Sequence, residues 1–264
     1  MQSKQPIQSK SRSPHVDSGG AFSAIMITYA LALSTAVELG GLNPVRVVLV
    51  TLLVAANVAS LVRVHLRLVS RPRKSDYALF LINVAPYLYV LYVAPPQPWL
   101  ALSVIPPLAV FLWEAFHGRG RGGRGQRCRD RAARIGLPAW LAMMGGKPSL
   151  AVINAASIWL AYHVFSAIYV EGKLPFRTIK PWAASIWWLS VLPPLAYASL
   201  GTGLYLALVE PTIRAIYSLR EGKVDRRGLR DRVRRIGIAL LLESIIMAVL
   251  LSALLMIGGF KSFP

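Results

Sequence analysis

The stretch IGIALLLESIIMAVLLSALLMI, residues 236–257, decides the fold class of this chain. Its 22 residues contain one ionisable side chain, Glu243. At 1.5 Å per residue, a helix of this length spans about 33 Å, enough to cross the roughly 30 Å hydrocarbon core of a bilayer. The preceding run REGKVDRRGLRDRVRR, residues 220–235, holds eight Lys and Arg residues. An apolar segment with a basic flank is typical of a membrane-spanning helix whose flank lies in the cytoplasm.

Similar apolar blocks occur along most of the chain, separated by short charged segments. Blocks of about 18 or more residues without charges are typical of transmembrane helices. The pattern predicts an all-α, polytopic transmembrane helical bundle with eight full passes plus one short or re-entrant helix. The full passes are expected at residues 21–39, 44–62, 77–94, 99–116, 149–170, 182–200, 202–219 and 236–257.

The short element is expected in the long apolar run of residues 135–170. That run contains one charge, Lys147, and is broken by Gly145, Gly146 and Pro148. Proline removes a backbone donor and glycine weakens a helix interior, so we expect a short helix before the break and a full helix from Ser149. The sequence leaves open whether residues 135–170 make two passes or a re-entrant hairpin.

Charge composition supports a membrane location over a soluble fold. Of the 264 residues, 55% are hydrophobic and 16% are charged, and the formal net charge is +19. Ordinary soluble domains carry about 25% charged residues. With the N-terminus placed in the cytoplasm, 26 of the 30 Lys and Arg residues fall on that side. We therefore expect a multi-pass protein of the cell membrane with a cytoplasmic N-terminus and an external C-terminus.

The domain organisation follows from the same segmentation. Residues 1–20 are polar and predict a disordered basic tail. Residues 21–260 predict a single transmembrane domain, with Arg-rich cytoplasmic loops at residues 63–76, 117–135 and 219–235. These loops predict contact with the bilayer and with anionic lipid headgroups. The Arg-Gly tract within residues 117–135 resembles an RNA-binding segment, but between two membrane helices we favour lipid contact over specific nucleic-acid binding.

Ionisable residues within apolar segments are the candidate functional residues, because a charge in lipid is costly. We propose a candidate intramembrane polar site from Glu243, His163, Glu210 and Arg214. Glu243 could bind a proton, a cation or a basic substrate group, or could pair with a neighbouring helix. The spacing of Glu210 and Arg214 favours an ion pair within one helix. His163 could relay protons or ligate haem, although a hydrogen-bonded structural role is favoured.

Catalytic and metal motifs are absent from the sequence. One cysteine, Cys128, excludes a disulfide framework and a multi-Cys metal site. The chain has no phosphate-binding Gly-rich loop, no nucleophile elbow and no His-Glu-x-x-His zinc motif. It also lacks the acidic cluster that Mg²⁺-dependent diphosphate chemistry requires. We therefore expect no cofactor and assign no catalytic residues, and the sequence leaves the question of an enzyme open while favouring a protein that is not one.

Three short strings carry a resemblance to a known family. They are GGAF at residues 19–22, WLAYHVFSAIYVEGKL at residues 159–174, and RIG at residues 235–237 ahead of Glu243. In these strings and their order, the chain resembles the YwiC-like family of polytopic membrane proteins. Where that family has Arg in the second string, this chain has Glu171. The resemblance implies a membrane location and an architecture, and it implies no reaction.

Three functions remain open on these observations. Transport or a transport-associated role is favoured by expected Pro kinks at Pro106-Pro107, Pro193-Pro194 and Pro211, because broken helices line substrate sites in transporters. The first alternative is a structural or assembly subunit of a membrane complex. The second is a lipid-modifying enzyme acting near Glu114 and His117.

Overall fold

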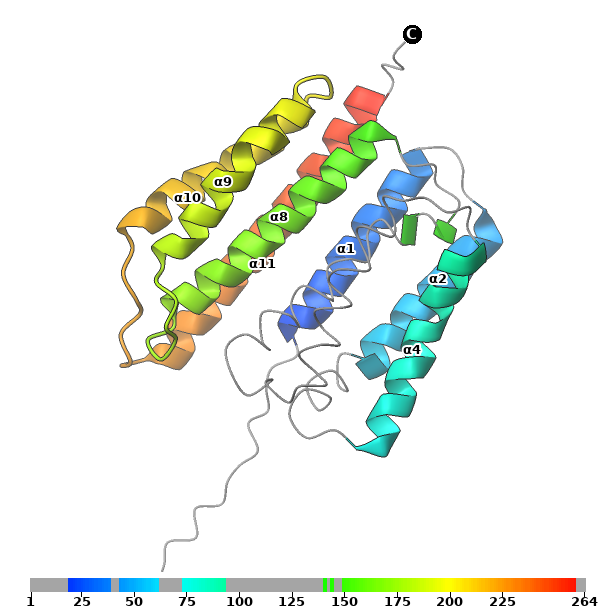
Figure 1. The fold of residues 1–264 in the computed structure, drawn as a ribbon, viewed down its shortest axis with the longest axis horizontal. Helices are drawn as coiled ribbons and strands as arrows, with labels where there is room; N and C mark the ends of the chain where they lie inside the picture. Colours follow the sequence, from blue (N-terminus) through cyan, green and yellow to red (C-terminus); the bar gives the residue numbers. More distant parts are fainter. Residues whose placement is uncertain are drawn as a thin grey trace, which may run out of the picture.

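The computed structural model describes residues 19–38, 43–61, 73–93, 140–141, 143–144 and 149–259, and all regular elements among them are helices (Figure 1). The all-α character agrees with the prediction. The elements are α1 (Gly19–Glu38), α2 (Pro44–Ala56), the π-helical turn η1 (Asn57–Leu61), α4 (Lys74–Val93), α8 (Leu150–Lys173), α9 (Trp182–Ser199), the 3-10 turn η3 (Leu204–Leu208), α10 (Val209–Arg220) and α11 (Leu229–Gly259).

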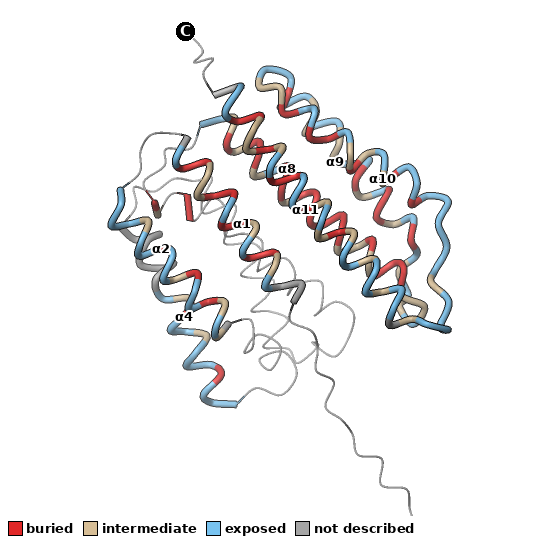
Figure 2. The backbone as a smooth tube through the Cα atoms, turned by 180° about the vertical axis from the view of Figure 1, so that it is seen from behind, coloured by how far each residue is buried: buried red, intermediate tan, exposed pale blue. Residues whose placement is uncertain are grey.

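The helices pack side by side as a bundle built around α8. Helix α8 contacts both α9 and α11, while α10 packs on α9 and α1 packs on α11. Figure 1 shows α2 and α4 on the far side of α1 from this group. The burial pattern in Figure 2 agrees with that order, because buried residues concentrate on α8 and on the helices around it, whereas α2 and α4 are largely exposed.

Local sequence explains where α8 begins and ends. The Ser149 side chain accepts a hydrogen bond from the backbone N–H of Val152 at 3.3 Å, which caps the first turn. At the other end, Gly172 lies so close to the next helix that a Cβ atom there would be 2.8 Å from Cα of Pro181. Only glycine allows this close approach, so Gly172 sets the tight connection from α8 to α9.

Two tryptophans anchor the core, and each has its ring nitrogen satisfied. Trp159 is fully buried and donates to Thr28 Oγ1 at 3.1 Å, which joins α8 to α1. Trp188 is also fully buried and donates to Thr212 Oγ1 at 2.9 Å, which joins α9 to α10. Burial of an indole N–H without a hydrogen-bond acceptor destabilises the folded protein. The two threonines supply that acceptor, so they help to fix how the helices pack.

The prediction of eight full passes is wrong. Among the described residues, two helices are long and apolar enough to cross a membrane, Leu150–Lys173 and Asp231–Ile257. Shorter apolar helices occur at Phe22–Val37 and Pro44–Ser60. The pass predicted at residues 99–116 and the loops at 63–72 and 117–135 lie outside the described residues, as does most of the short element predicted before Ser149.

Backbone breaks explain part of this difference. The predicted pass at residues 202–219 starts at a turn in which Gly203 has a left-handed φ of 72°, and continues as a 3-10 turn before α10 begins. Helix α10 has 12 residues and is therefore about 18 Å long, too short to cross a bilayer. In α9, Pro193 and Pro194 lie inside a helix of 18 residues.

The two long apolar helices differ in their surroundings. In the most apolar part of α8, 67% of the residues are buried within the protein, whereas the corresponding share in α11 is 28%. Helix α11 therefore presents long apolar side chains, such as Leu242, Ile246 and Val249, outside the bundle. By length and composition these two helices favour a membrane-associated protein.

Candidate functional site

The ion pair between Arg214 and Glu243 joins α10 to α11. Nη2 of Arg214 donates to Oε1 of Glu243, and the side chains are 24% and 15% exposed. Nε of the same guanidinium lies 4.0 Å from Oε1 of Glu210, one turn earlier in α10. We call these three residues the Arg214 cluster. It consists of one cation held between two carboxylates from two helices.

The charges in the Arg214 cluster do not balance when both carboxylates are ionised. Arginine stays protonated in proteins, so it neutralises one of the two glutamates. Oε2 of Glu210 and Oε2 of Glu243 are buried and accept no hydrogen bond from the described residues. Each oxygen is therefore an acceptor with capacity left for a proton or a cation. The cluster can therefore take up and release one proton or one monovalent cation.

Tyr169 in α8 connects the Arg214 cluster to the end of the bundle. The guanidinium carbon of Arg214 lies 5.4 Å from the centre of the Tyr169 ring, within cation–π range. The Tyr169 hydroxyl donates to Oε2 of Glu221 at 2.8 Å. The same side chain therefore faces a partly buried cation with its ring and an exposed carboxylate with its hydroxyl.

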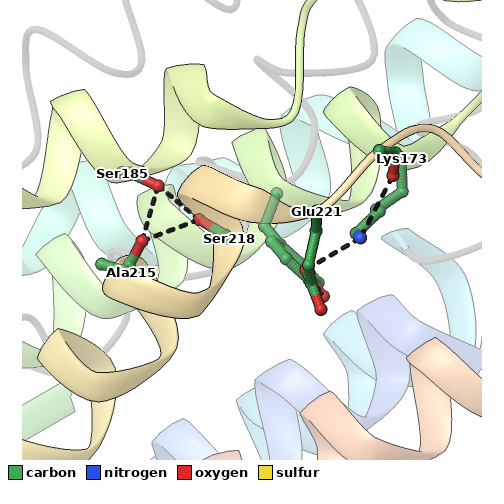
Figure 3. A network of polar contacts seen from close by, with 7 residues as sticks. Lys173, Ser185, Ala215, Ser218 and Glu221 are labelled. Carbon is green, nitrogen blue, oxygen red and sulfur yellow. Dashed lines mark hydrogen bonds and ion pairs between the residues drawn. The ribbon is translucent and has the colours of Figure 1, made fainter.

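Lys173 and Glu221 form a second ion pair at the end of α8. Nζ of Lys173 lies 2.8 Å from Oε2 of Glu221 and also donates to the carbonyl oxygen of Gly222 at 3.3 Å (Figure 3). The ammonium group sits 5.4 Å from the Tyr169 ring centre. We call Tyr169, Lys173 and Glu221 the Lys173 cluster. It ties the last turn of α8 to the residues that follow α10.

The Lys173 cluster changes the acidity of Glu221. Burial alone would raise the pKa of this carboxyl group, but hydrogen bonds from Lys173 and Tyr169 and the charges of Lys173 and Arg214 outweigh it. The pKa of Glu221 is therefore lowered from its ordinary value of 4.5. Hydrogen bonding to the charged form favours ionisation, so Glu221 is held as a carboxylate.

Two serines fasten α9 to α10 next to these clusters. Ser185 donates to the carbonyl oxygen of Ala215 at 2.7 Å and is hydrogen-bonded to Ser218 (Figure 3). All three residues are buried. This contact fixes the position of α10 along α9 one residue beyond Arg214, so it helps to orient the guanidinium toward α11.

The structure brings three of the four candidate residues together. Glu210, Arg214 and Glu243 interact directly, whereas His163 lies on α8 against aromatic rings. Its ring centre is 4.2 Å from that of Trp159, edge to face, and 5.4 Å from that of Tyr162. That these residues carry out a function stays a prediction. The positions proposed for a lipid-modifying enzyme, Glu114 and His117, lie outside the described residues.

Sequence reasoning missed the contribution of Lys173, Tyr169 and Glu221. Lys173 lies outside every expected pass and every expected Arg-rich loop, yet it is buried in the last turn of α8. A usable signal was available, since Lys173 and Glu221 are opposite charges that follow two apolar segments ending on the same predicted side. No group of three or more His, Cys, Asp or Glu side chains suited to a metal ion occurs in the described part of the chain.

Comparison with known proteins identifies no relative of this chain. No protein-family model matches the chain, and neither the curated proteins nor the solved structures searched contain a match.

Proposed function

We propose that this chain is a membrane protein with a transport or transport-associated role, in which the Arg214 cluster binds and releases a proton. The observation that carries the proposal is the ion pair between Arg214 and Glu243. Glu243 lies eight residues after Arg235, the last base before the apolar run of α11, which is about 12 Å along the helix. The pair would therefore sit within the hydrocarbon core of the bilayer.

The cost of charge in lipid supports a proton over a larger ligand. An unbalanced carboxylate is expensive in a medium of low polarity, and protonation removes the charge at the smallest steric cost. With one proton on either glutamate, the Arg214 cluster is neutral overall. Deprotonation leaves one negative charge, which would favour entry of the next proton or of a cation.

The distribution of bases supports an orientation for the two long apolar helices. Helix α8 ends at Lys173 and α11 begins at Leu229, next to a loop that carries several exposed arginines. By the positive-inside rule this end faces the cytoplasm. In the same orientation, the start of α1 lies on the cytoplasmic side and the end of α11 lies outside. A relationship to the YwiC-like family remains a prediction and supplies no reaction.

Proton flux into proteoliposomes tests this proposal. The full-length chain is reconstituted into vesicles that contain a pH-sensitive dye, and a potassium diffusion potential is imposed. We expect proton entry above that of empty vesicles, and the variant Glu243→Gln should reduce it at least about tenfold because the amide cannot ionise. The matched control is Asp231→Asn, which removes an exposed carboxylate from the same helix and should leave the flux unchanged.

A structural or assembly role is the second candidate, and the same ion pair favours it. A charge pair that joins α10 to α11 can hold the two helices together without binding or releasing a proton. This role predicts that reconstituted wild-type protein shows no more proton flux than empty vesicles, while Glu243→Gln still lowers the stability of the purified protein. That combination of results would overturn the transport proposal and retain the structural one.

A further inference from the structure

Exposed basic side chains gather at the end of the bundle where α8 ends and α11 begins. They lie on the α8–α9 connection, on the last residue of α10, on the α10–α11 loop and on the first turns of α11. We call them the basic rim. Its members are Lys180, Arg220, Lys223, Arg226, Arg227, Arg232, Arg234 and Arg235, and all of them are exposed.

Acidic residues at this end do not neutralise the basic rim. Glu221 is already paired with Lys173, and Asp225 accepts a hydrogen bond from the backbone N–H of Arg227. Asp231 is the third acidic residue of residues 220–235. Among the described residues, no ion pair engages the eight basic side chains of the rim. The rim therefore presents a large excess of positive charge.

Exposed apolar side chains border the basic rim and favour a membrane surface as its partner. Phe176 and Trp182 are 61% and 44% exposed, and Ile238 in α11 is 49% exposed. Nζ of Lys180 lies 5.8 Å from the ring centre of Trp182. Aromatic rings interleaved with Lys and Arg, next to an apolar surface, are typical of the interface between a membrane and water.

The position of the basic rim along the helices leads to the same interpretation. Helix α8 ends at Lys173, and the apolar span of α11 starts at Asp231. Figure 1 shows these two ends on the same side of the bundle. If α8 and α11 cross a bilayer, the rim lies at the depth of the lipid headgroups. Arginine forms paired hydrogen bonds with phosphate, which suits it to that position.

We propose that the basic rim binds the phosphate groups of anionic glycerophospholipids at the membrane surface. The proposal shares with the proposed function the placement of α8 and α11 in a membrane, and it is independent of the Arg214 cluster. Zwitterionic phospholipids carry the same phosphate beside a positive group. The rim therefore distinguishes anionic from zwitterionic phospholipids by their net charge. A juxtamembrane base near an anionic surface strengthens binding several-fold, and several of them act together.

Lipid binding to the purified full-length chain tests the proposal. The chain is held in mild detergent and titrated with phosphatidylglycerol or with phosphatidylcholine, and the bound lipids are counted by native mass spectrometry. We expect tighter binding of phosphatidylglycerol. The triple variant Arg226→Gln, Arg227→Gln, Arg234→Gln should weaken it about a hundredfold, since three bases that each strengthen binding about fivefold are lost.

Charge-preserving substitutions at the same sites provide the matched control. Replacement of Arg226, Arg227 and Arg234 by Lys keeps the three positive charges but removes the paired hydrogen bonds, so it should weaken phosphatidylglycerol binding much less than the Gln variant does. Because the three side chains are exposed, both triple variants should retain the unfolding temperature of the wild type.

Three outcomes would overturn the proposal. They are equal affinity for phosphatidylglycerol and phosphatidylcholine, unchanged affinity in the Gln variant, and displacement of the lipid by a single-stranded RNA oligonucleotide that binds more tightly. The last outcome would identify the rim as a nucleic-acid surface. A loss of lipid binding in the Glu243→Gln variant is not expected, so failure of the proton proposal is distinguishable from failure of this one.

Discussion

Arg214 and Glu243 lie 29 residues apart in the chain and form an ion pair between α10 and α11. The second carboxylate lies farther from the guanidinium, with Oε1 of Glu210 at 4.0 Å from Nε of Arg214. Since α10 is short, this contact is a principal polar link between it and α11, the longest of the described helices. The stability of the α10–α11 packing should therefore depend on it.

Substitution of Glu243 by Gln should destabilise the purified protein. The change removes the carboxylate that faces Arg214 and leaves a partly buried cation with a weaker partner. Loss of one partner of a buried pair costs about 3–5 kcal/mol, and the partial exposure of both side chains lowers this to about 1–3 kcal/mol. Unfolding of the detergent-solubilised chain measures the effect. Asp231→Asn is the control, and an equal loss in both variants would show that the pairing is unimportant.

Substitution of Tyr169 by Phe should remove one hydrogen bond and keep the ring that faces Arg214. The Tyr169 hydroxyl donates to Glu221 at 2.8 Å. Loss of a hydrogen bond to a charged group costs about 1.5–3 kcal/mol, and partial exposure of Glu221 places the expected loss at the lower end. The control is Tyr197→Phe, because Tyr197 is 80% exposed. Equal unfolding temperatures for the two variants would contradict the prediction.

Stability should fall in acid through the protonation of Glu221. Because its pKa is lower in the folded protein than the ordinary value of 4.5, the folded state favours the carboxylate. The corresponding stabilisation is fully present above pH 4.5 and is lost as the pH falls through the lower, folded-state pKa. The unfolding free energy of wild type should therefore decline in this range, and that of Glu221→Gln should decline less. Parallel pH profiles would contradict the assignment.

Substitution of Gly172 by Ala should weaken the connection between α8 and α9. A Cβ atom at this position would lie 2.8 Å from Cα of Pro181 and 3.0 Å from the carbonyl oxygen of Lys180, both of them backbone atoms. Relief of such a clash requires a backbone shift, with a cost of about 1–3 kcal/mol. Gly237→Ala is the matched control, because a Cβ atom there meets nothing within 4 Å and alanine favours a helix.

Sequence patterns located the two long apolar helices but not the partners of their charges. The start of α8 follows from local chemistry, since Ser149 is a good cap after a Gly-Pro break. Apolar content alone overestimated the membrane passes, because a block such as residues 202–219 does not reveal that Gly203 adopts a left-handed conformation and shortens the helix that follows.

The pairing of Glu243 with Arg214 could not be predicted from sequence. It depends on how α10 and α11 are rotated about their axes, and apolar residues lie on every side of α11. The contact between Glu210 and Arg214 is different, because the spacing of one helical turn brings these residues together wherever the helix is placed. Local pairs are therefore predictable here, and contacts between helices are not.

The loop after α10 is fastened to α8 by its backbone as well as by Lys173. The N–H of Val224 donates to the carbonyl oxygen of Lys173 at 2.9 Å, and the side chain of Lys223 donates to the carbonyl oxygen of Arg177. These bonds therefore join the α8–α9 connection to the α10–α11 loop. A force applied to the arginines of the α10–α11 loop would be transmitted to Glu221, and from Glu221 through Tyr169 to the guanidinium of Arg214.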